Sequence, residues 1–279
     1  MIFDFEDDYE QEKPPEPGDD PAVLRVTLEL RAFFEEHPQD VFYETQLCIF
    51  FEDRYFHWVT SRALKGMRLD GEIGSELQKQ PPHVTLRFYY HRRNRYWKRR
   101  AGEIRKLVQT FSEQPFTESL GLQGESMIDA GLPRIGFMPS AVEVRSWKDR
   151  NWIETGHDLD RVFTRDGLHY GTEIKNKLGY IDQVEFRAKL AMCNHLELIP
   201  LFIARMMPKT YIKDVSDAGG FTLIMKYQFY PYAHRELAKT IASELKLPVD
   251  CPARLNQNTL DRFLNWHLKK LQRLNREFS

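Results

Sequence analysis

The chain has 279 residues, 42% of them hydrophobic, and a formal net charge of −1, as in globular proteins that bury a core. The cysteines, Cys48, Cys193 and Cys251, lie far apart with no CxxC pair, which excludes a disulfide framework or zinc ribbon and favours a reducing, cytosolic setting. No apolar run approaches the roughly 18 residues of a membrane span, and the acidic N-terminus matches neither a secretory signal nor a transit peptide.

The net charge hides a segregation of acidic and basic residues. Residues 1–20 hold nine acids and one lysine, and with their prolines they predict a disordered tail. Residues 83–110 hold nine lysines and arginines and one acid, interleaved with aromatics such as Tyr90 and Trp97. This composition suits phosphate contacts and base stacking, although a solvated helix face would have a similar composition.

From Pro21 onward, apolar spacing predicts three helices, over 21–36, 43–53 and 54–71, and then two strands, over 72–80 and 83–92. That order is typical of a winged helix-turn-helix, which we expect over residues 21–94, with the third helix in the major groove of DNA. Val59, Ala63 and Met67 would form its buried face, and the opposite face carries His57, Ser61, Lys65 and Arg68. The alternative is a small helical domain used for protein contacts or dimerisation. The predicted nucleic-acid contacts are Lys65, Arg68, Arg92, Arg93, Arg95, Lys98, Arg99 and Arg100.

Beyond residue 95 the pattern is mixed α/β, and we expect one domain over 95–279. It predicts helices over 96–112, 183–197, 234–246 and 259–276, and strands over 140–147, 159–164, 169–175, 199–206 and 221–229. No element is assigned between Phe116 and the first of these strands, or over 208–220. The aromatic segment "KYQFYPYAH", Tyr227 to His234, would either pack on the last helices or form a stacking platform beside a site.

The two strands over 159–164 and 169–175 flank the turn signal Arg165-Asp166-Gly167, which predicts a hairpin. Because alternate strand residues share a face, Glu173 and Lys175 emerge together, and the short turn brings Asp160 to the same surface. Two neighbouring carboxylates repel unless a cation lies between them, and a hard ion such as Mg²⁺ prefers oxygen ligands. The lysine would lie beside a phosphate, where it stabilises developing negative charge.

The pattern of Asp160 in "HDLDRVF" followed by Glu173-Ile174-Lys175 in "YGTEIKN" resembles the PD-(D/E)xK nuclease superfamily, which includes restriction enzymes and repair nucleases. The resemblance implies a restriction endonuclease-like αβββαβ core over about residues 96–230 and a metal-dependent nuclease. It also implies that Asp160, Glu173 and the carbonyl of Ile174 bind the metal, and that Glu103 is the acid on the first core helix. Leu159 precedes Asp160, where the family name has proline.

Other assignments remain open at this stage. Asp158 is a rival to Asp160, and Gln183 and Lys189 lie on the following helix, where they would reach a phosphate or remain on the surface. The preferred function is an Mg²⁺- or Mn²⁺-dependent DNA endonuclease, cytoplasmic and DNA-associated, with a homodimer expected for cutting both strands. The alternatives are a non-catalytic DNA-binding regulator that keeps a nuclease-like domain, and an RNA-directed nuclease, because the metal chemistry does not require deoxyribose.

Overall fold

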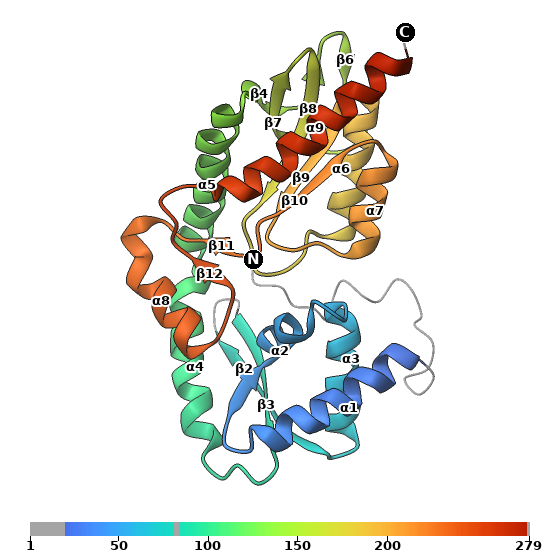
Figure 1. Cartoon of the computed structure of the whole chain (residues 1–279). Coiled ribbons are helices and arrows are strands. Elements are labelled where there is room, and N and C mark those ends of the chain that lie inside the picture. Colours follow the sequence, from blue (N-terminus) through green and yellow to red (C-terminus); the bar gives the residue numbers. More distant parts are fainter. Residues whose placement is uncertain (1–19, 81–83, 278–279) are drawn as a thin grey trace. The chain divides into compact units, whose positions relative to one another are not determined.

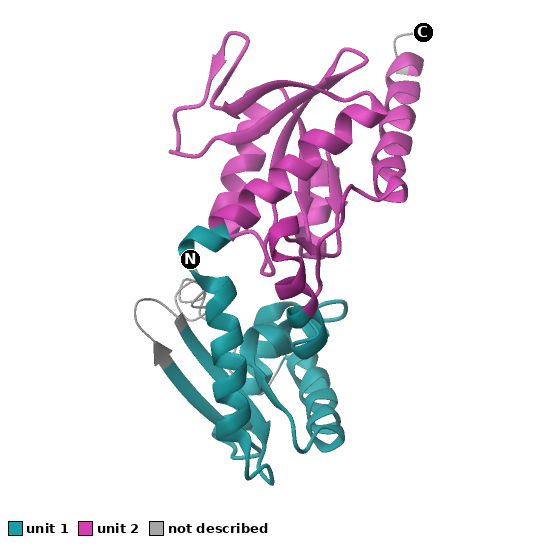
Figure 2. Cartoon of the chain, turned by 90° about the vertical axis from the view of Figure 1, so that its left-hand side faces the viewer, with its two compact units in different colours: residues 1–117, 240–247 teal, residues 118–239, 248–279 magenta. Residues whose placement is uncertain are grey.

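The computed structural model describes residues 20–80 and 84–277, and the chain divides into two compact units (Figures 1 and 2). Unit 1 comprises the chain up to Thr117 together with 240–247, and unit 2 comprises 118–239 and 248–279. The division therefore falls later than the expected boundary between residues 94 and 95. Helix α4 (Trp97–Ser112) contacts strands of unit 1, and Trp97 stacks on Tyr90 with ring centroids 4.6 Å apart. The predicted acidic tail, apart from Asp20, lies outside the described residues.

Unit 1 packs its first three helices on a small antiparallel sheet, in the order β1-β3-β2. Asp20 caps the first helix by accepting a 2.8 Å hydrogen bond from Ala22 N, and apolar residues at helical spacing then face the core. The elements are α1 (Pro21–Glu36), β1 (Val41–Tyr43), α2 (Glu44–Phe51), α3 (His57–Leu69), β2 (Ile73–Gln80), β3 (Val84–His91) and then α4. The three predicted helices and two strands are present, and β1 is an addition.

The third helix differs from its prediction at one residue. Val59, Ala63 and Met67 are buried as expected, but His57, assigned to the opposite face, is also buried. Its ring Nε2 lies 3.1 Å from a carboxylate oxygen of Glu52, so the histidine is held by a buried polar contact rather than exposed to solvent. A polar side chain can be buried when the fold places a hydrogen-bonding partner next to it. Helical periodicity does not predict where such a partner lies.

Unit 2 is a three-layer α/β structure around a five-stranded mixed sheet in the order β10-β9-β8-β7-β4 (Figure 1). β4, β7 and β8 are antiparallel to one another in turn, whereas β8, β9 and β10 are parallel. One face packs on α5 and α9, and the other on α6 and α7. The bounds are α5 (Gln114–Gly131), η1 (Leu132–Ile135), β4 (Met138–Val144), β5 (Ser146–Trp147), β6 (Arg150–Asn151), β7 (Leu159–Arg165), β8 (Leu168–Lys175), α6 (Gln183–His195), β9 (Ile199–Ala204), α7 (Lys209–Asp217), β10 (Phe221–Ile224), β11 (Gln228–Phe229), η2 (Tyr232–His234), α8 (Arg235–Glu244), β12 (Val249–Asp250) and α9 (Gln257–Glu277).

The hairpin predicted at Arg165-Asp166-Gly167 is present between β7 and β8. Asp166 and Gly167 have φ of 48° and 75°, both in the left-handed region that a two-residue hairpin turn requires. The turn is tied to helix α9, because the fully buried His267 lies 2.9 Å from Asp166 Oδ2 and 2.6 Å from the Tyr170 hydroxyl. This chain of polar groups, buried at His267 and Tyr170 and exposed at Asp166, joins the turn, strand β8 and the C-terminal helix.

Three segments differ from the sequence prediction. The unassigned residues after Phe116 form most of helix α5, in which Gly124 lies where an added Cβ would come within 2.5 Å of Asn176. The unassigned 208–220 segment contains α7. The single strand predicted over 221–229 is two strands, β10 and β11, separated at Lys226, whose φ is 70°. The close packing at this glycine and the left-handed backbone of this lysine depend on tertiary contacts, and local sequence preference does not predict them.

In the part of the chain that the structure describes, no helix combines the length and apolar character needed to cross a membrane.

Replacing a closely packed glycine of β8 and an open glycine of α5 by alanine should change the free energy of unfolding in opposite directions. In Gly171→Ala the new Cβ would lie 2.8 Å from Cys193 Sγ and 2.9 Å from Leu159 Cδ1, so overpacking should lower the free energy of unfolding by about 1–3 kcal/mol. In Gly121→Ala, within α5, the new Cβ meets nothing within 4 Å, and the helix should gain about 0.5–1 kcal/mol. Urea denaturation followed by circular dichroism measures both; equal effects would contradict this account of the core.

Candidate functional site

Asp160 and Glu173 lie opposite each other on the neighbouring strands β7 and β8. The pairing of Arg161 with Thr172 sets the antiparallel register, and the next positions along the two strands are Asp160 and Glu173. The register places both carboxylates on one face of the sheet, because directly opposed residues share a face. Asp160 Oδ2 also accepts a 2.6 Å hydrogen bond from the backbone N–H of Ile174, which fixes the aspartate against β8. The hairpin therefore assembles the two acids, as the sequence predicted.

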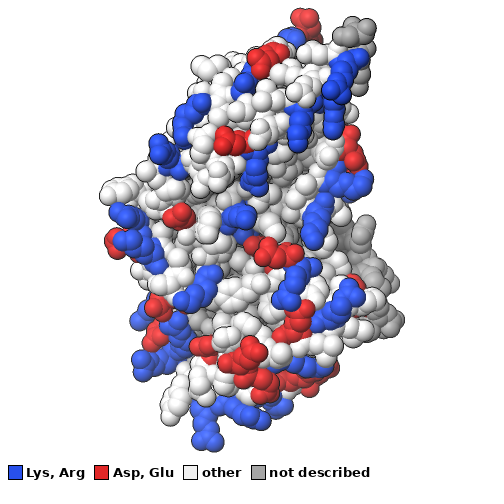
Figure 3. All heavy atoms as spheres, in the orientation of Figure 1, with Lys and Arg blue, Asp and Glu red and all other residues white. Residues whose placement is uncertain are grey.

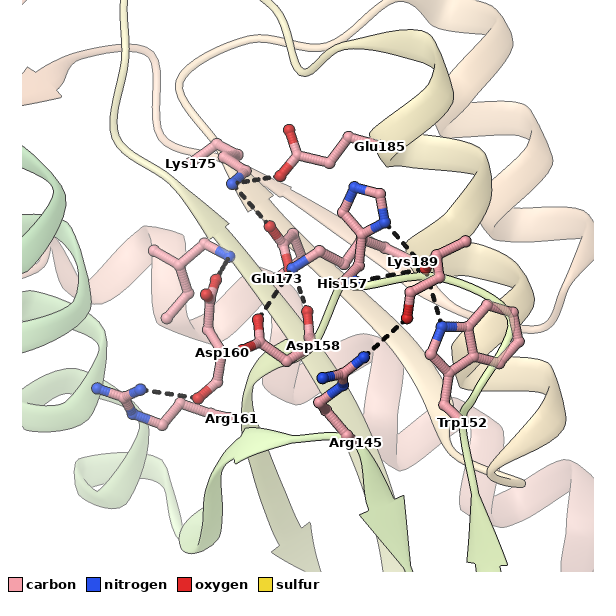
Figure 4. Close-up of polar contacts among 12 residues, drawn as sticks. Arg145, Trp152, His157, Asp158, Asp160, Arg161, Glu173, Lys175, Glu185 and Lys189 are labelled. Carbon is pink, nitrogen blue, oxygen red and sulfur yellow. Dashed lines mark hydrogen bonds and ion pairs between the residues drawn. The ribbon is translucent and has the colours of Figure 1, made fainter. Parts of the chain in front are cut away.

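Glu173 is a buried charge held by two lysines (Figure 4). Its side chain is 1% exposed, and Lys175 Nζ lies 2.9 Å from Oε1 while Lys189 Nζ lies 2.7 Å from Oε2. Neither carboxylate oxygen receives an aligned hydrogen bond from the described residues. A carboxylate in this position would be very costly without cations beside it, so the two ammonium groups are what make its burial tolerable.

Helix α6 supplies the other half of the cluster. Asp182 caps the helix through hydrogen bonds from the backbone of its first turn, and Glu185 and Lys189, four residues apart, then project from the same side. Glu185 Oε1 lies 2.7 Å from Lys175 Nζ, and Lys189 Nζ donates to the backbone carbonyl of Asp158. The site is a network of alternating charges contributed by β7, β8 and α6.

Burial and charge shift the acidity of these groups in opposite directions. Burial, and then the charge of Glu173, raise the pKa of the Asp160 carboxyl to about 7. Burial alone would lower the pKa of Lys175, but Glu173 and Glu185 outweigh it and hold that pKa above its ordinary value. Lys177 is affected differently: burial, and then the charge of Lys175, lower its pKa to about 8. At neutral pH Asp160 is thus poised between its two protonation states beside a firmly protonated Lys175.

The predicted site residues fall in different places. Asp160, Glu173 and Lys175 come together, whereas the rival Asp158 is about half-exposed and reaches Lys189 at 3.7 Å. Ile174 meets Asp160 through its N–H, and the predicted role of its carbonyl stays a prediction.

Glu103 is not part of this cluster. It lies on α4 in unit 1, where it is ion-paired with Arg99 and Arg100 at 3.1 Å and 3.2 Å. Hydrogen bonds from these two arginines lower the pKa of the Glu103 carboxyl. The helix that packs on the sheet of unit 2 is α5, and its acids Glu125 and Asp129 bind Arg161 instead. Glu103 was assigned by position along the chain, and helix α5, unassigned in the sequence, was the missing information.

Sequence reasoning missed Glu185 and left the role of Lys189 open. The sequence does contain a signal for both residues. Asp182 is a typical helix-capping residue, and an acid and a lysine at positions i and i+4 of the following helix, Glu185 and Lys189, lie on the same side of it. Asn176, after Lys175, proves to be structural. Its side chain bonds Leu120 O at 2.6 Å and both the carbonyl and the N–H of Phe229 at 2.7 Å, pinning the end of β8.

The predicted nucleic-acid contacts all lie in unit 1. Most are exposed, and two, Arg68 and Arg100, are half-buried. The positive charge is partly neutralised: Arg100 pairs with Glu244 at 3.1 Å as well as with Glu103. Acidic side chains also lie among the basic ones on the face drawn in Figure 3. The basic block of the sequence therefore combines exposed cations with acidic partners at Arg99 and Arg100. The exposed members are Lys65, Arg92, Arg93, Arg95, Lys98 and Arg99.

The cluster fits a divalent cation in its donor chemistry. Asp160 and Glu173 present hard oxygen donors on one face, where the ammonium groups of Lys175 and Lys189 hold the oxygens of Glu173. Within residues 20–80 and 84–277 no three His, Cys, Asp or Glu side chains gather as a metal site. Mg²⁺ needs fewer, since it is commonly bound through one or two carboxylates and keeps several waters.

Comparisons of the chain with models of protein families, with curated proteins and with solved structures found no match.

The raised pKa of Asp160 predicts a specific pH dependence of stability. The unfolded carboxyl has a pKa near 3.8 and the folded one about 7, so the folded state keeps the proton in this window. The associated stability is complete below pH 3.8 and is lost as pH rises through 7. Asp160→Asn stays neutral, so between pH 5 and pH 8 wild type should lose about 2–3 kcal/mol relative to the variant. Urea denaturation at both pH values measures this; a constant difference would show that Asp160 remains ionised from pH 5 upward.

Proposed function

We propose that the chain is a metal-dependent endonuclease that hydrolyses phosphodiester bonds of DNA, guided by a winged-helix-like unit. The observation that carries the proposal is the pairing of Asp160 and Glu173 on one sheet face with Lys175 2.9 Å from Glu173. A buried and a half-buried acid beside a lysine do not stabilise an apolar core, but they suit a site that hydrolyses phosphodiester bonds.

The order of elements in unit 2 supports a restriction endonuclease-like core. A helix, three antiparallel strands, a helix and a parallel strand follow one another as α5, β4, β7, β8, α6 and β9, with the small β5–β6 hairpin inserted. This is the αβββαβ order of the PD-(D/E)xK superfamily, with Asp160 on the second strand and Glu173 and Lys175 on the third. In this proposal the core begins at α5.

The chain's own residues would divide the chemistry between them. Asp160 and Glu173 would hold a divalent ion such as Mg²⁺ or Mn²⁺, with the Ile174 carbonyl as a further ligand. When bound, the ion supplies Lewis acidity at the phosphate. Lys175, whose raised pKa keeps it protonated, would donate to a phosphate oxygen and stabilise the charge that develops there. Glu185 would keep the lysine oriented, since it lies 2.7 Å from Nζ.

Unit 1 would bind duplex DNA. Its order of α1, β1, α2, α3 and the β2–β3 hairpin is that of a winged helix, and α3 carries exposed Lys65 at the place expected of a groove-reading helix. Exposed Arg92, Arg93 and Arg95 follow the hairpin directly. Cutting both strands would require two such sites, which favours a homodimer.

The second candidate is a non-catalytic DNA-binding regulator. The observation in its favour is that both oxygens of Glu173 lie within 2.9 Å of lysine ammonium groups, as in a purely structural ion-pair network. An RNA-directed nuclease would use the same residues as the DNA enzyme.

The proposal predicts Mg²⁺-dependent nicking of supercoiled plasmid that is lost in Lys175→Ala. Removing a group that stabilises charge on the reacting phosphate should lower the cleavage rate about 10²–10³-fold. The fold should tolerate this change, because Lys189 still neutralises Glu173. Agarose-gel rates with Mg²⁺, with Mn²⁺ and with EDTA measure the effect, with a structured RNA as the second substrate.

Lys213→Ala is the matched control for that experiment. Lys213 is an exposed lysine of unit 2 that pairs only with the exposed Asp217 in the described structure, so its loss should leave the rate unchanged. Tight duplex binding with no cutting under any divalent ion would sink the nuclease and support the regulator, while cleavage of RNA alone would support the RNA-directed enzyme.

Lys65→Ala should weaken duplex binding by unit 1. If Lys65 contacts a phosphate, its loss reduces the slope of log affinity against log salt by about 1. Arg25→Ala, an exposed cation on α1, is the control and should leave that slope unaltered. Fluorescence anisotropy of a labelled duplex at several salt concentrations, in EDTA to prevent cutting, gives both slopes; equal slopes for the two variants would contradict a DNA-contacting third helix.

A further inference from the structure

Unit 2 contains a large cavity that the proposed hydrolysis does not use. Its volume is about 990 Å³, and it is lined by the ends of β10 and β12, the start of α9 and the connections next to them. The apolar residues Met225, Phe229 and Leu255 line part of it, and so does Tyr227, which is 47% exposed. A space of this size is comparable to the pockets that enclose organic ligands.

The charge around the cavity is unbalanced. Four cationic side chains line it, against the single carboxylate of Asp250: Arg134, Lys226, Arg254 and Arg262. Arg134 and Arg262 are oriented by uncharged oxygens, with Arg134 Nη2 3.0 Å from Gln257 Oε1 and Arg262 Nη2 2.7 Å from Ile224 O. Among the described residues none of the four pairs with a carboxylate. Cations gathered without acidic partners favour an anionic occupant.

The cavity opens at the same edge of the sheet as the candidate site. Lys175, Ala204 and Ile224 are in register across the parallel strands β8, β9 and β10, so the carboxyl ends of these strands lie side by side. The end of β10 is two strand spacings, about 10 Å, from the end of β8. A smaller cavity bordered by Ile174 and Lys175 shares Met225, Tyr227 and Phe229 with the large one. The two spaces therefore adjoin each other on the sheet face that packs on α5 and α9, and Glu173, which pairs with Lys189 of α6, lies on the other face of the same edge.

We infer that the large cavity binds a single nucleic-acid strand that reaches it from the proposed cleavage site around the carboxyl-terminal edge of the sheet. Its phosphates would contact Lys226 and Arg254 at the rim, and a base would stack on Tyr227. A single strand fits better than a duplex, because only an unpaired base offers both faces to an aromatic ring over an apolar floor. Spanning about 10 Å takes only a few nucleotides, since even a strand stacked as in a duplex advances roughly 3.4 Å per phosphate, and an extended one advances further. The inference rests on the proposed function, in which the same strand is cut at the site of Asp160, Glu173 and Lys175.

The test is binding of a fluorescein-labelled oligothymidylate of about 12 nucleotides to the full chain in EDTA. The test variant is Lys226→Asn with Arg254→Ala, because asparagine tolerates the φ of 70° at position 226. Its control, Lys269→Ala with Arg273→Ala, removes the same charge from exposed positions further along α9, neither of which lines the cavity.

We expect the test variant to bind the strand at least about tenfold more weakly, with a salt slope smaller by about 1.4, and the control to change little. Tyr227→Leu should weaken binding about fivefold or more without altering the slope. Equal losses in the test and control variants would overturn the inference, and so would an equal loss for a duplex of the same length. Circular dichroism checks that each variant is folded.

The same variants separate this inference from the proposed hydrolysis. Plasmid cutting with Mg²⁺ and oligonucleotide binding in EDTA are therefore both measured on the cavity variants. If no divalent ion supports cutting, yet the cavity variants lose the strand, the strand site stands and hydrolysis fails. If cutting occurs while the cavity variants bind normally, hydrolysis stands and the strand site fails.

Discussion

The burial of one negative charge, Glu173, in the middle of the sheet governs the arrangement of unit 2. Strand β8 is covered on one side by α5 and α9 and on the other by α6 and α7, so its side chains meet other side chains on both faces. A carboxylate in such a position is stable only with cations in direct contact with it. Lys175 comes from the same strand as Glu173. Lys189 comes from helix α6, so it can reach Glu173 only if α6 packs on the sheet at one position. The placement of α6 follows from that requirement, and the charge of Glu173 adds to burial in raising the pKa of Asp160.

Sequence periodicity revealed most of the framework and failed where tertiary contacts override local preference. The β7–β8 hairpin could be predicted because Asp166-Gly167 encodes a left-handed turn directly. Helix α5 could not be predicted, since its glycines are typical helix breakers, and only the structure shows that Gly124 and Gly131 allow Asn176 and Leu255 to approach closely. Lys226 interrupts the predicted strand because its backbone is in the left-handed region. A lysine side chain gives no indication of that conformation.

The candidate site was predictable to the extent that its residues share a hairpin. Strand alternation and a short turn suffice to bring Asp160, Glu173 and Lys175 together, because both are local rules. Glu185 and Lys189 arrive from another element, and their position depends on where α6 packs. Glu103 illustrates the opposite error: chain order alone assigned it to the core, whereas contacts between α4 and the strands of unit 1 place it elsewhere.

The return of residues 240–247 to unit 1 constrains how this protein can be made and dissected. Leu245 is fully buried, and its carbonyl accepts a 2.8 Å hydrogen bond from Gln46, nearly two hundred residues earlier. During synthesis on the ribosome, residues 240–247 emerge only after most of the polypeptide, so their contacts with unit 1 form late. The two units are interleaved in sequence, and neither can be excised as one uninterrupted fragment without carrying away part of the other or leaving part of itself behind.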